Sequence, residues 1–363
     1  MSHCNSEPVV SSINSGQFKQ IALYEQNFKP DKACIIDPNC CPKSNSRMTM
    51  IILSLIAGLA LLVWSADRFI AGAVGLAHYF NLPPIIIGVV IVGFGTSAPE
   101  LLISGFAAWH GNSGLAVGNA IGSNITNIAL ILGVTALLTP IVVSDMTLKR
   151  EFPVLFAATA LSWFFLSDGV LSLDNALLLI LTLLLALAFL VFITKKEDPA
   201  IEEPEYYQSL GRSVLWTLLG LIVLLISSDI LVSASTDLAK VFGVSDLVIG
   251  LSIVAIGTSL PELAASVTGA IKHHTDIAVG NIIGSNIFNI LGVIGIPGLI
   301  STYYIPEEVF TRDLPVMLGL TLLLFVFAFL TRKGKGMYRM VGIIFILCFI
   351  AFQTNLYLGS TAI

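Results

Sequence analysis

Two short segments of the chain hold residue types that suit cation binding, because each sets one carboxylate beside two hydroxyl groups. They read GTSAPEL at residues 95–101 and GTSLPEL at residues 257–263. In each, the glutamate follows a threonine by four residues and a serine by three, so on a helical turn the three side chains share a face. The residues are Thr96, Ser97 and Glu100 in the first segment and Thr258, Ser259 and Glu262 in the second.

A second pair of segments supplies hydroxyl and amide groups. AVGNAIGSNITNI at 116–128 aligns with AVGNIIGSNIFNI at 278–290, and each contains a serine four residues before an asparagine. At that spacing both side chains can point into one cavity. The pairs are Ser123 with Asn127 and Ser285 with Asn289.

Together the four segments offer two carboxylates and many neutral oxygens, without a thiolate or an imidazole. These are hard ligands, which suit Ca2+ or Na+ and suit zinc or copper poorly. Two carboxylates balance the charge of one Ca2+ or of two Na+, so the two loads can compete for one site. The chemistry therefore favours exchange of one ion for the other, which needs no covalent step and no cofactor.

The proline in each glutamate segment predicts that the helix kinks or breaks there. Pro99 and Pro261 lack a backbone N–H and clash with the carbonyl four residues earlier, while a preceding glycine tolerates the distortion. At membrane depth such irregular backbone is tolerated only inside protein or along a cavity. Carbonyls freed by the break become available as cation ligands. They are expected near Gly93 and Phe94 in the first segment and near Ala255 and Ile256 in the second.

An ionised glutamate at membrane depth costs at least about 2.5–3.5 kcal/mol on insertion scales, so Glu100 and Glu262 need a compensating partner. Neither segment holds a lysine or an arginine. The partner must therefore be a mobile cation, a proton or solvent. A protonated carboxyl group satisfied by hydrogen bonds is the structural alternative.

The composition predicts that these segments lie in a membrane. The chain of 363 residues is 56% hydrophobic and only 11% charged, whereas soluble domains carry about 25% charged residues. Apolar runs of roughly 20 residues, long enough to cross a bilayer, recur from Met50 onward. They predict an all-α integral membrane protein with ten transmembrane helices, at residues 50–78, 83–109, 114–138, 153–167, 171–194, 212–240, 245–271, 276–300, 313–331 and 338–356.

The chain also repeats itself at an offset of 162 residues. Between residues 65 and 128, 28 of 64 positions are identical to the residue 162 positions later. Each half holds five predicted helices, and because five is odd the second half must enter the membrane from the opposite side. Two inverted five-helix repeats with broken helices at the midplane are a recurrent design of secondary transporters. The predicted parts are a polar N-terminal extension at 1–47, repeats at 48–194 and 212–363, and an acidic cytoplasmic linker at 195–211.

The placement of basic residues predicts the orientation in the membrane. Lysine and arginine concentrate in the loops that follow odd-numbered helices, as at Lys149, Arg150, Lys195 and Lys196. The positive-inside rule places those loops in the cytoplasm and both termini outside.

The polar extension at 1–47 differs from everything after it and contains four cysteines, Cys4, Cys34, Cys40 and Cys41. Their irregular spacing does not match a structural zinc site. An external tail with a disulfide is one interpretation. We favour a disordered leader, which lacks the residue order of a signal peptide and receives no function.

The paired motifs resemble those of the calcium/cation antiporters, whose two repeats carry GTSxPE and GNxxGSNxxN segments. The likeness covers both repeats and the ten-helix plan, from about residue 50 onward. The chain is similar to a prokaryotic-type sodium/calcium exchanger, because no large regulatory domain separates its halves.

The resemblance implies a role for each motif residue. Glu100 and Glu262 would be the central Ca2+ ligands, and potassium co-transport is disfavoured because Asn289 stands where some relatives carry Asp. The other implied ligands are oxygens of Thr96 and Thr258 beside the glutamates, Na+-site hydroxyls of Ser97, Ser259, Ser123 and Ser285, carbonyls of Gly93 and Ala255, and the side chains of Asn127 and Asn289.

We therefore expect a secondary antiporter that exchanges Ca2+ for Na+ by alternating access in a prokaryotic inner membrane, with no nucleic acid and no obligatory protein partner. A proton-coupled exchanger is the nearest alternative, but a proton would not require the neutral oxygens of the serines and carbonyls. A further alternative is a calcium sensor that transports nothing, or a membrane enzyme. The helices contain no paired catalytic Asp, Ser-His or metalloprotease motif that would support an enzyme.

Other polar residues have interpretations that do not involve ions. For the asparagines and serines of the motifs, hydrogen bonds between helices are the alternative to ion binding, and this alternative is strongest for Asn119, Asn124, Asn281 and Asn286. Asp67 and Asp229 are duplicated near helix ends, where structural, gate-lining and ion-binding roles remain open. Solvated or regulatory roles are favoured for the predicted loop residues His110, His273 and His274.

Overall fold

The computed structural model describes residues 42–111, 113–194, 209–241, 255–331, 337 and 339–361. The chain divides into two units, Met1–Met50 and Ile51–Ile363, and the features discussed below lie in the second. The four cysteines of the predicted extension, most of the predicted linker at 195–211 and the predicted helix start at 245–254 fall outside the described residues. The first described helix begins at Pro42, ahead of the predicted start of the first repeat at residue 48.

The first half of the chain forms helices where its apolar runs predict them. Two of these helices contain a π-helical turn, in which backbone hydrogen bonds reach one residue further than in an α-helix. The elements are α2 (Pro42–Tyr79); α3 (Pro84–Ile87), η2 (Gly88–Val92), α4 (Gly93–Thr96) and α5 (Ala98–Trp109); α6 (Ser113–Thr126), η3 (Asn127–Ile131) and α7 (Leu132–Leu138); α8 (Asp145–Lys149) and α9 (Glu151–Leu166); and α10 (Leu173–Thr194).

The second half repeats this order among its described residues. Its elements are α11 (Leu210–Val241); α13 (Ala255–Thr258) and α14 (Leu260–Ile271); α15 (Thr275–Ile287), η5 (Phe288–Val293) and α16 (Ile294–Ile300); η6 (Val309–Asp313) and α17 (Leu314–Thr331); and α18 (Arg339–Thr361). Two short antiparallel strands, β1 (Val170–Leu171) between α9 and α10 and β2 (Tyr303–Tyr304) between α16 and η6, join loops of the two halves, with Val170 opposite Tyr304.

Among the described residues, seven helices are long and apolar enough to cross a membrane, and the bent pair Pro84–Thr96 and Ala98–Trp109 is an eighth candidate. The other two predicted spans correspond to α9, which has 16 residues, and to α13 with α14, whose predicted start is not described. The all-α membrane fold is therefore confirmed, while the count of ten spans stays a prediction.

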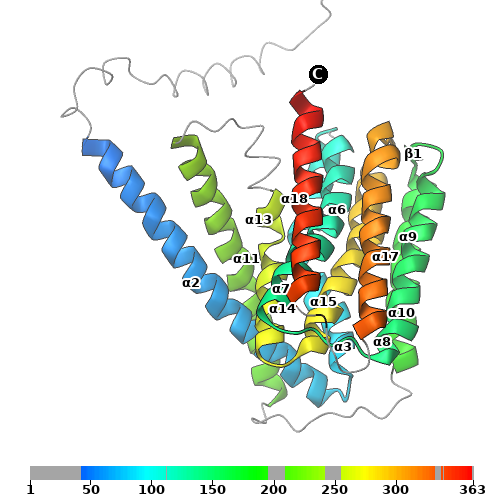
Figure 1. The fold of residues 1–363 in the computed structure, drawn as a ribbon, viewed down its shortest axis with the longest axis horizontal. Helices are drawn as coiled ribbons and strands as arrows, with labels where there is room; N and C mark the ends of the chain where they lie inside the picture. The colour runs from blue at the N-terminus through cyan, green and yellow to red at the C-terminus, as the bar shows by residue number, and fades with distance from the viewer. Residues whose placement is uncertain are drawn as a thin grey trace, which may run out of the picture. The chain divides into compact units, whose positions relative to one another are not determined.

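The outer helices expose apolar side chains, as a membrane protein requires. On α10, the side chains of Leu181, Leu184 and Leu185 are 51%, 59% and 61% exposed. Lipid tails are as apolar as leucine, so this exposure is not penalised in a bilayer. On α15, by contrast, every residue from Ile277 to Ile287 is buried. Helix α15 therefore belongs to the interior of the bundle, whereas α10 lies at its edge (Figure 1).

Glycines let α15 approach the first half of the chain closely. A Cβ on Gly280 would lie 2.5 Å from the carbonyl oxygen of Ile85, and a Cβ on Gly284 would lie 2.5 Å from that of Val89. No side chain fits at these distances, so the backbones of α15 and η2 pack directly on each other. This contact joins the two repeats beside the motif residues.

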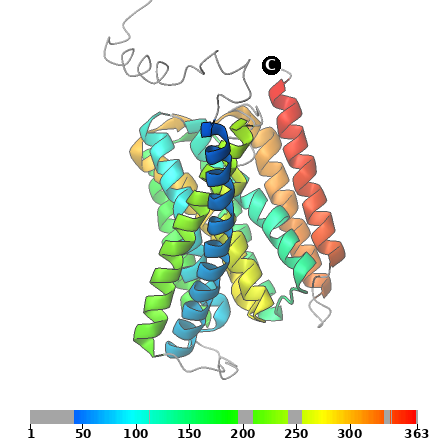
Figure 2. The same ribbon diagram turned by 90° about the vertical axis from the view of Figure 1, so that its left-hand side faces the viewer.

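Helices α2 and α11 cross each other in close contact (Figure 2). Gly220 of α11 lies against the backbone of Phe69, and Gly72 of α2 lies against Thr217. Phe69 belongs to a hydrophobic cluster that is separate from the larger cluster formed by most of the other helices. The helices α2 and α11 are therefore held together by a smaller hydrophobic core than the rest of the bundle.

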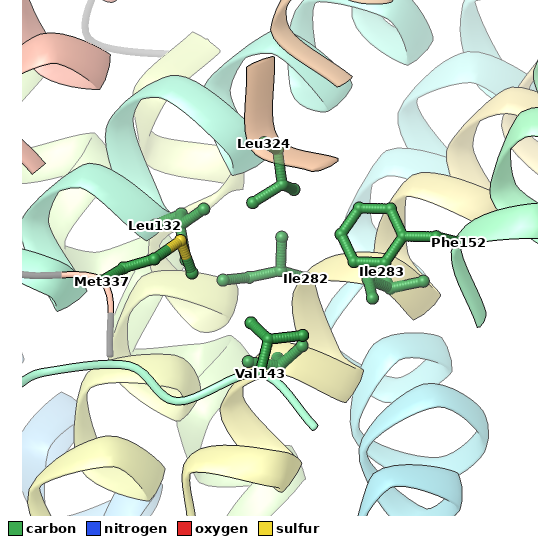
Figure 3. A pocket seen from close by; sticks show the side chains of 8 residues that line it. Leu132, Val143, Phe152, Ile282, Ile283, Leu324 and Met337 are labelled. Carbon is green, nitrogen blue, oxygen red and sulfur yellow. The ribbon is translucent and has the colours of Figure 1, made fainter. Parts of the chain in front are cut away.

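The larger core joins the two halves of the chain, and Figure 3 shows part of it. Leu132 and Val143 from the first half meet Ile282 and Ile283 of α15 around a cavity of about 10 Å3. The described residues that line this cavity are all apolar. A buried water needs at least about 10–15 Å3 and polar partners. The space is therefore a packing gap between the repeats.

Candidate functional site

Both glutamate segments break their helices at the serine, as the prolines predict. Ser97 separates α4 from α5 with φ −81° and ψ 4°, and the two parts of that span are bent by 43°. Ser259 separates α13 from α14 with φ −92° and ψ 8°. Pro99 and Pro261 lie in the first turn of the helix after each break, where the missing N–H costs nothing.

The two serines at the breaks form hydrogen bonds across the repeats. Ser97 Oγ donates to Glu262 Oε1 at 3.1 Å, and Ser259 Oγ approaches Glu100 Oε1 at 3.5 Å. A serine three residues before a glutamate is typical of a helix capping box, yet neither serine caps its own helix. The crossed contacts instead bring both carboxyl groups to one point between the repeats.

Both carboxyl groups are buried, with Glu100 0% and Glu262 1% exposed. No lysine or arginine pairs with them among the described residues. Each lies in the first turn of a helix, where the helix dipole stabilises a negative charge by about 0.3–1 kcal/mol. Burial of an ion costs several kcal/mol, so the dipole alone does not compensate it. The arrangement can therefore hold a cation between two carboxylates.

Two asparagines fix the backbone that carries the glutamates. Asn119 Nδ2 donates to the carbonyl of Glu100 at 3.1 Å and to Ser104 Oγ at 2.9 Å. The second repeat contains the same pair of bonds. There, Asn281 Nδ2 donates to the carbonyl of Glu262 at 3.2 Å and to Ser266 Oγ at 2.8 Å. These are hydrogen bonds between helices of the kind that the structural interpretation of the two asparagines predicts.

The serines that complete this network, Ser104 and Ser266, were not singled out from the sequence. They follow the glutamates by four residues and are identical at the 162-residue offset. Both are 0% exposed. The occurrence of serine at both positions of the repeat could therefore have identified them, since a lone serine in an apolar helix otherwise indicates nothing specific.

Thr96 and Ser285 meet on the closely packed side of the site. Thr96 Oγ1 lies 3.0 Å from the carbonyl oxygen of Val92, 3.1 Å from Asn281 Oδ1 and 3.5 Å from Ser285 Oγ. Ser285 Oγ in turn lies 3.4 Å from the carbonyl oxygen of Gly93. Hydroxyl, amide and carbonyl oxygens of both repeats thus converge here.

The expectation that the break frees the carbonyl of Gly93 is wrong. This carbonyl accepts the backbone N–H of Ser97 at 3.1 Å, and the carbonyl of Ile256 accepts that of Ser259 at 3.1 Å. The helices bend at the serines without losing these bonds. The second lone pair of the Gly93 carbonyl is approached by Ser285 Oγ at 3.4 Å, so a ligand role for Gly93 requires the cation to displace that hydroxyl.

Thr258 and Ser123 lie beside a cavity of about 450 Å3. It follows α6 from Gly114 to Thr126, about 18 Å at 1.5 Å per residue. Asn119 also lines the cavity. The equivalents of these three residues, Thr96, Ser285 and Asn281, are the ones in mutual contact on the closely packed side.

The asparagines at the ends of the second motif lie at π-helical turns. Asn127 begins η3 and the equivalent Asn289 lies in η5, and such turns are frequent at functional sites. Asn127 Nδ2 donates to Asn286 Oδ1 at 3.4 Å, and Asn124 Nδ2 contacts Met317 Sδ at 3.5 Å. These contacts satisfy only part of each amide.

Among the described residues, several buried polar atoms of the glutamates and of the second motif lack a hydrogen-bond partner. Each such atom costs about 1–3 kcal/mol unless a ligand satisfies it. Both motifs of both repeats therefore hold polar atoms that a ligand could satisfy. The atoms are Glu100 Oε2, Glu262 Oε2, Asn124 Oδ1, Asn127 Oδ1, Asn286 Nδ2, and Asn289 Nδ2 and Oδ1.

The remaining residues singled out from the sequence lie apart from this cluster. Ala255 begins α13 at the edge of the described residues. Asp67 Oδ1 pairs with Lys272 Nζ at 2.6 Å, and Asp229 is exposed. No group of three or more His, Cys, Asp or Glu side chains could hold a metal ion within the described ranges.

The loop histidines lie where the sequence predicts them. His110 ends α5, and His273 and His274 precede α15. Burial and the nearby charges of Lys272 and His273 lower the pKa of His274. Among the described side chains, none of the three histidines forms a hydrogen bond or an ion pair with either glutamate, so their ligand role stays disfavoured.

Comparison with known proteins agrees with this geometry. The sodium/calcium exchanger protein family matches the chain at residues 50–195 and again at 212–358. CaxA of Alkalimonas amylolytica is 45% identical over 319 residues, which cover 85% of this chain and 99% of CaxA. Inner membrane protein YrbG of Escherichia coli strain K12 is 39% identical, with 85% of this chain and 98% of YrbG covered.

A solved structure gives the same result. The sodium-calcium exchanger NCX_Mj, soaked with Na+ and Sr2+, superposes with a TM-score of 0.72 at 31% identity, covering 84% of this chain and 97% of that chain. The likeness thus extends over nearly the whole of the solved exchanger and over both matched halves of the sequence. This multi-pass membrane protein therefore belongs to the sodium/calcium exchanger family of cation antiporters.

Proposed function

We propose that the chain exchanges Ca2+ for Na+ at one site between its two repeats. The observation that carries the proposal is the pair of buried carboxyl groups, Glu100 and Glu262, each approached by the break serine of the other repeat. Carboxylate, hydroxyl and amide oxygens are ligands that Ca2+ and Na+ prefer. Two negative charges suit one Ca2+ or two Na+, so the site binds either one Ca2+ or two Na+ in turn.

Each predicted ligand has a place in this proposal. The carboxylates of Glu100 and Glu262 bind Ca2+, with Thr96 and Thr258 beside them. The hydroxyls and amides bind Na+ when Ca2+ is absent. These are Ser97, Ser123, Ser259 and Ser285 with Asn127 and Asn289, together with the carbonyls of Gly93 and Ala255.

Sodium is favoured over a proton as the counter-ion. A proton needs only a carboxylate, whereas the site adds many neutral oxygens, including the unpartnered Oδ1 atoms of Asn127 and Asn289. The names of relatives such as the sodium/calcium exchanger MaX1 of Methanosarcina acetivorans, 29% identical, point the same way. The cavity beside Ser123 and Thr258 supports an ion path to the site from one membrane face.

The setting of this activity follows from the charge pattern. Repeats at 48–194 and 212–363, joined by the acidic linker, invert relative to each other and alternate in access. The loops rich in lysine and arginine lie in the cytoplasm and both termini outside. A prokaryotic inner membrane is the proposed location, in line with relatives such as YrbG.

The counter-ion is tested with the purified protein in sealed vesicles loaded with buffered medium. Uptake of isotopic Ca2+ is measured under an outward Na+ gradient at equal pH, and then under a pH gradient without Na+. We expect Na+ to drive uptake and the pH gradient alone to drive none. Uptake driven only by pH would assign proton coupling instead.

The ligands are tested by replacing each glutamate with its neutral amide. Glu100→Gln and Glu262→Gln remove one charge each and should abolish exchange while the protein stays folded. Glu151→Gln is the matched control, because Glu151 is also buried, at 1% exposure, but lies in the first turn of α9. Full transport by both site variants would refute the site, and Ca2+ binding without flux in the unaltered protein would favour a sensor.

A further inference from the structure

A groove of about 510 Å3 runs between α9 and α10, away from the glutamate site. These two helices lie side by side at the right-hand edge of the bundle in Figure 1. Small side chains leave room for it, since Ala157 and Ala158 of α9 and Ala186 of α10 line the groove. Phe189, which is 50% exposed, lines it as well.

The length of the groove matches one leaflet of a bilayer. Along α10 it extends from Thr182 to Ile193, about 16 Å at 1.5 Å per residue. The hydrocarbon core of a bilayer is about 30 Å thick, so one leaflet takes about half of that. Ile193 is also the last residue of the apolar span of α10. The groove therefore begins at the membrane surface and ends near the midplane.

The surface end of the groove is basic. Lys149 and Arg150 line it and lie directly before α9. Because α9 and α10 run antiparallel through a short connection, the start of α9 and Ile193 near the end of α10 lie at the same end of the helix pair. None of the described residues that line the groove is acidic. Lys149 is exposed.

We propose that this groove binds an anionic phospholipid. Its phosphate is held by Lys149 and Arg150, and one acyl chain lies along Ala157, Ala158 and Ala186. Basic pockets at the cytoplasmic end of transmembrane helices are known to bind anionic headgroups, and the proposed orientation places these two residues on that side. A neutral lipid fills only the apolar part. The proposal does not depend on which ion drives transport.

The test compares two lipids that differ only in headgroup charge. Native mass spectrometry of the full chain in detergent measures binding of phosphatidylglycerol and of phosphatidylcholine with the same acyl chains. Each basic residue near an anionic surface is worth about 5-fold in affinity. We expect phosphatidylglycerol to bind more tightly, and Lys149→Gln with Arg150→Gln to reduce that preference by on the order of 10-fold or more.

A matched control separates a site from general surface attraction. Arg212→Gln with Arg339→Gln removes two exposed charges from the starts of α11 and α18, and should leave the preference unchanged. An equal loss in both double variants would overturn the proposal. So would unaltered binding of phosphatidylglycerol after the loss of Lys149 and Arg150.

A second variant tests the apolar part independently of charge. Ala186→Phe fills the groove while both cations remain, and should lower the number of bound molecules of either lipid. The same spectra show the oligomeric state. If the unaltered chain is a dimer that Ala186→Phe dissociates, the groove is an interface between two copies and the lipid proposal is wrong.

Discussion

Equivalent faces of the two repeats are packed in opposite ways. On α15, Gly280 and Gly284 touch the backbone of η2 so closely that no side chain fits. On α6, the equivalent Gly118 and Gly122 line the large cavity, and among the described residues nothing lies within 4 Å of a Cβ at either position. Among the described residues, the face of α15 is therefore closed by backbone and the equivalent face of α6 is open.

This difference does not come from the local sequence, because the four glycines and their neighbours are nearly identical in both segments. The face of α15 contacts residues 85–93, whose equivalents at the 162-residue offset, 247–255, lie outside the described residues except for Ala255. In the alternating access proposed above, exchange of these two arrangements would reverse the membrane face from which the site is open.

The largest expected effect comes from placing a methyl group in the closed face. Gly284→Ala puts a Cβ 2.5 Å from the carbonyl oxygen of Val89, where only backbone can yield. Overpacking of this kind costs about 1–3 kcal/mol and more where backbone is involved. We expect a lower midpoint of thermal unfolding in detergent and loss of Ca2+ exchange in vesicles.

The matched variant on the open face sharpens the comparison. Gly122→Ala meets no described atom within 4 Å, so the unfolding midpoint should not change. Exchange should nevertheless slow, because the face must close as its counterpart does during the cycle. Equal unfolding midpoints for Gly122→Ala and Gly284→Ala would show that the two faces are packed alike.

A smaller effect is expected from the crossed serine contacts. Ser97→Ala removes a 3.1 Å hydrogen bond to Glu262, while Ser259→Ala removes a 3.5 Å approach to Glu100. A hydrogen bond to a charged group is worth about 1.5–3 kcal/mol, and it weakens beyond ordinary distances. Ser97→Ala should therefore raise the Ca2+ concentration for half-maximal uptake by about 10-fold or more.

The two serine variants serve as controls for each other. Ser259→Ala should raise the half-maximal Ca2+ concentration by a smaller factor, and the order of the two variants is the measured quantity. A larger effect of Ser259→Ala would contradict the asymmetry. Thermal unfolding of both variants in detergent verifies that each is folded.

The next prediction concerns the wall of the cavity on the open side. Arg312 Nε lies 2.7 Å from Asp313 Oδ1, and both residues line the cavity. Asp313→Asn removes one of the two carboxylates that act on Arg312, leaving Glu308, and so makes the path of a cation more positive. Such charges change association rates in a salt-dependent way. We expect Ca2+ uptake at low ionic strength to fall by roughly 10-fold and to recover as salt is added.

Asp174→Asn is the control for this charge, because Asp174 is an exposed carboxylate in the first turn of α10 that does not line the cavity. Its uptake should equal that of the unaltered protein. Uptake by Asp313→Asn that does not respond to salt would indicate a structural defect instead of an electrostatic one.

Much of the site could be predicted from the sequence because duplication marks it. The identity of GTSxPEL at two positions located both glutamates, and Pro99 and Pro261 fixed the breaks, since a missing N–H acts locally. Apolar length alone located the helices. Each of these signals depends on a residue and its near neighbours in the chain.

Features that depend on the other repeat could not be predicted. A serine three residues before a glutamate indicates a cap, yet Ser97 bonds Glu262, which is 165 residues away. The carbonyl of Gly93 was expected to be free, but a bend at Ser97 preserves its bond. Nor does the sequence distinguish the closed glycines from the open ones. These outcomes are set by how the halves pack against each other.

The smallest expected effect concerns an ion pair on the closed side. Lys272 Nζ lies 2.6 Å from Asp67 Oδ1 and joins the end of α14 to α2, with side chains 33% and 41% exposed. At the equivalent positions Asp229 is exposed, and His110 bonds the carbonyl of Phe106 at 2.8 Å. As with the glycines, the contact between Lys272 and Asp67 has no counterpart between the equivalent residues, His110 and Asp229, among the described contacts.

An ion pair this exposed is worth about 0–1 kcal/mol, because solvent and salt screen it. Lys272→Gln should therefore change the equilibrium constant between the described conformation and the alternative conformation by at most about 5-fold, in favour of the alternative. The expected result is a rise of that size in the half-maximal Ca2+ concentration at low ionic strength, absent at high ionic strength and reversed by Lys272→Arg. Complete loss of exchange in Lys272→Gln, or no rescue by arginine, would mean that Lys272 does more than hold the closed face in place.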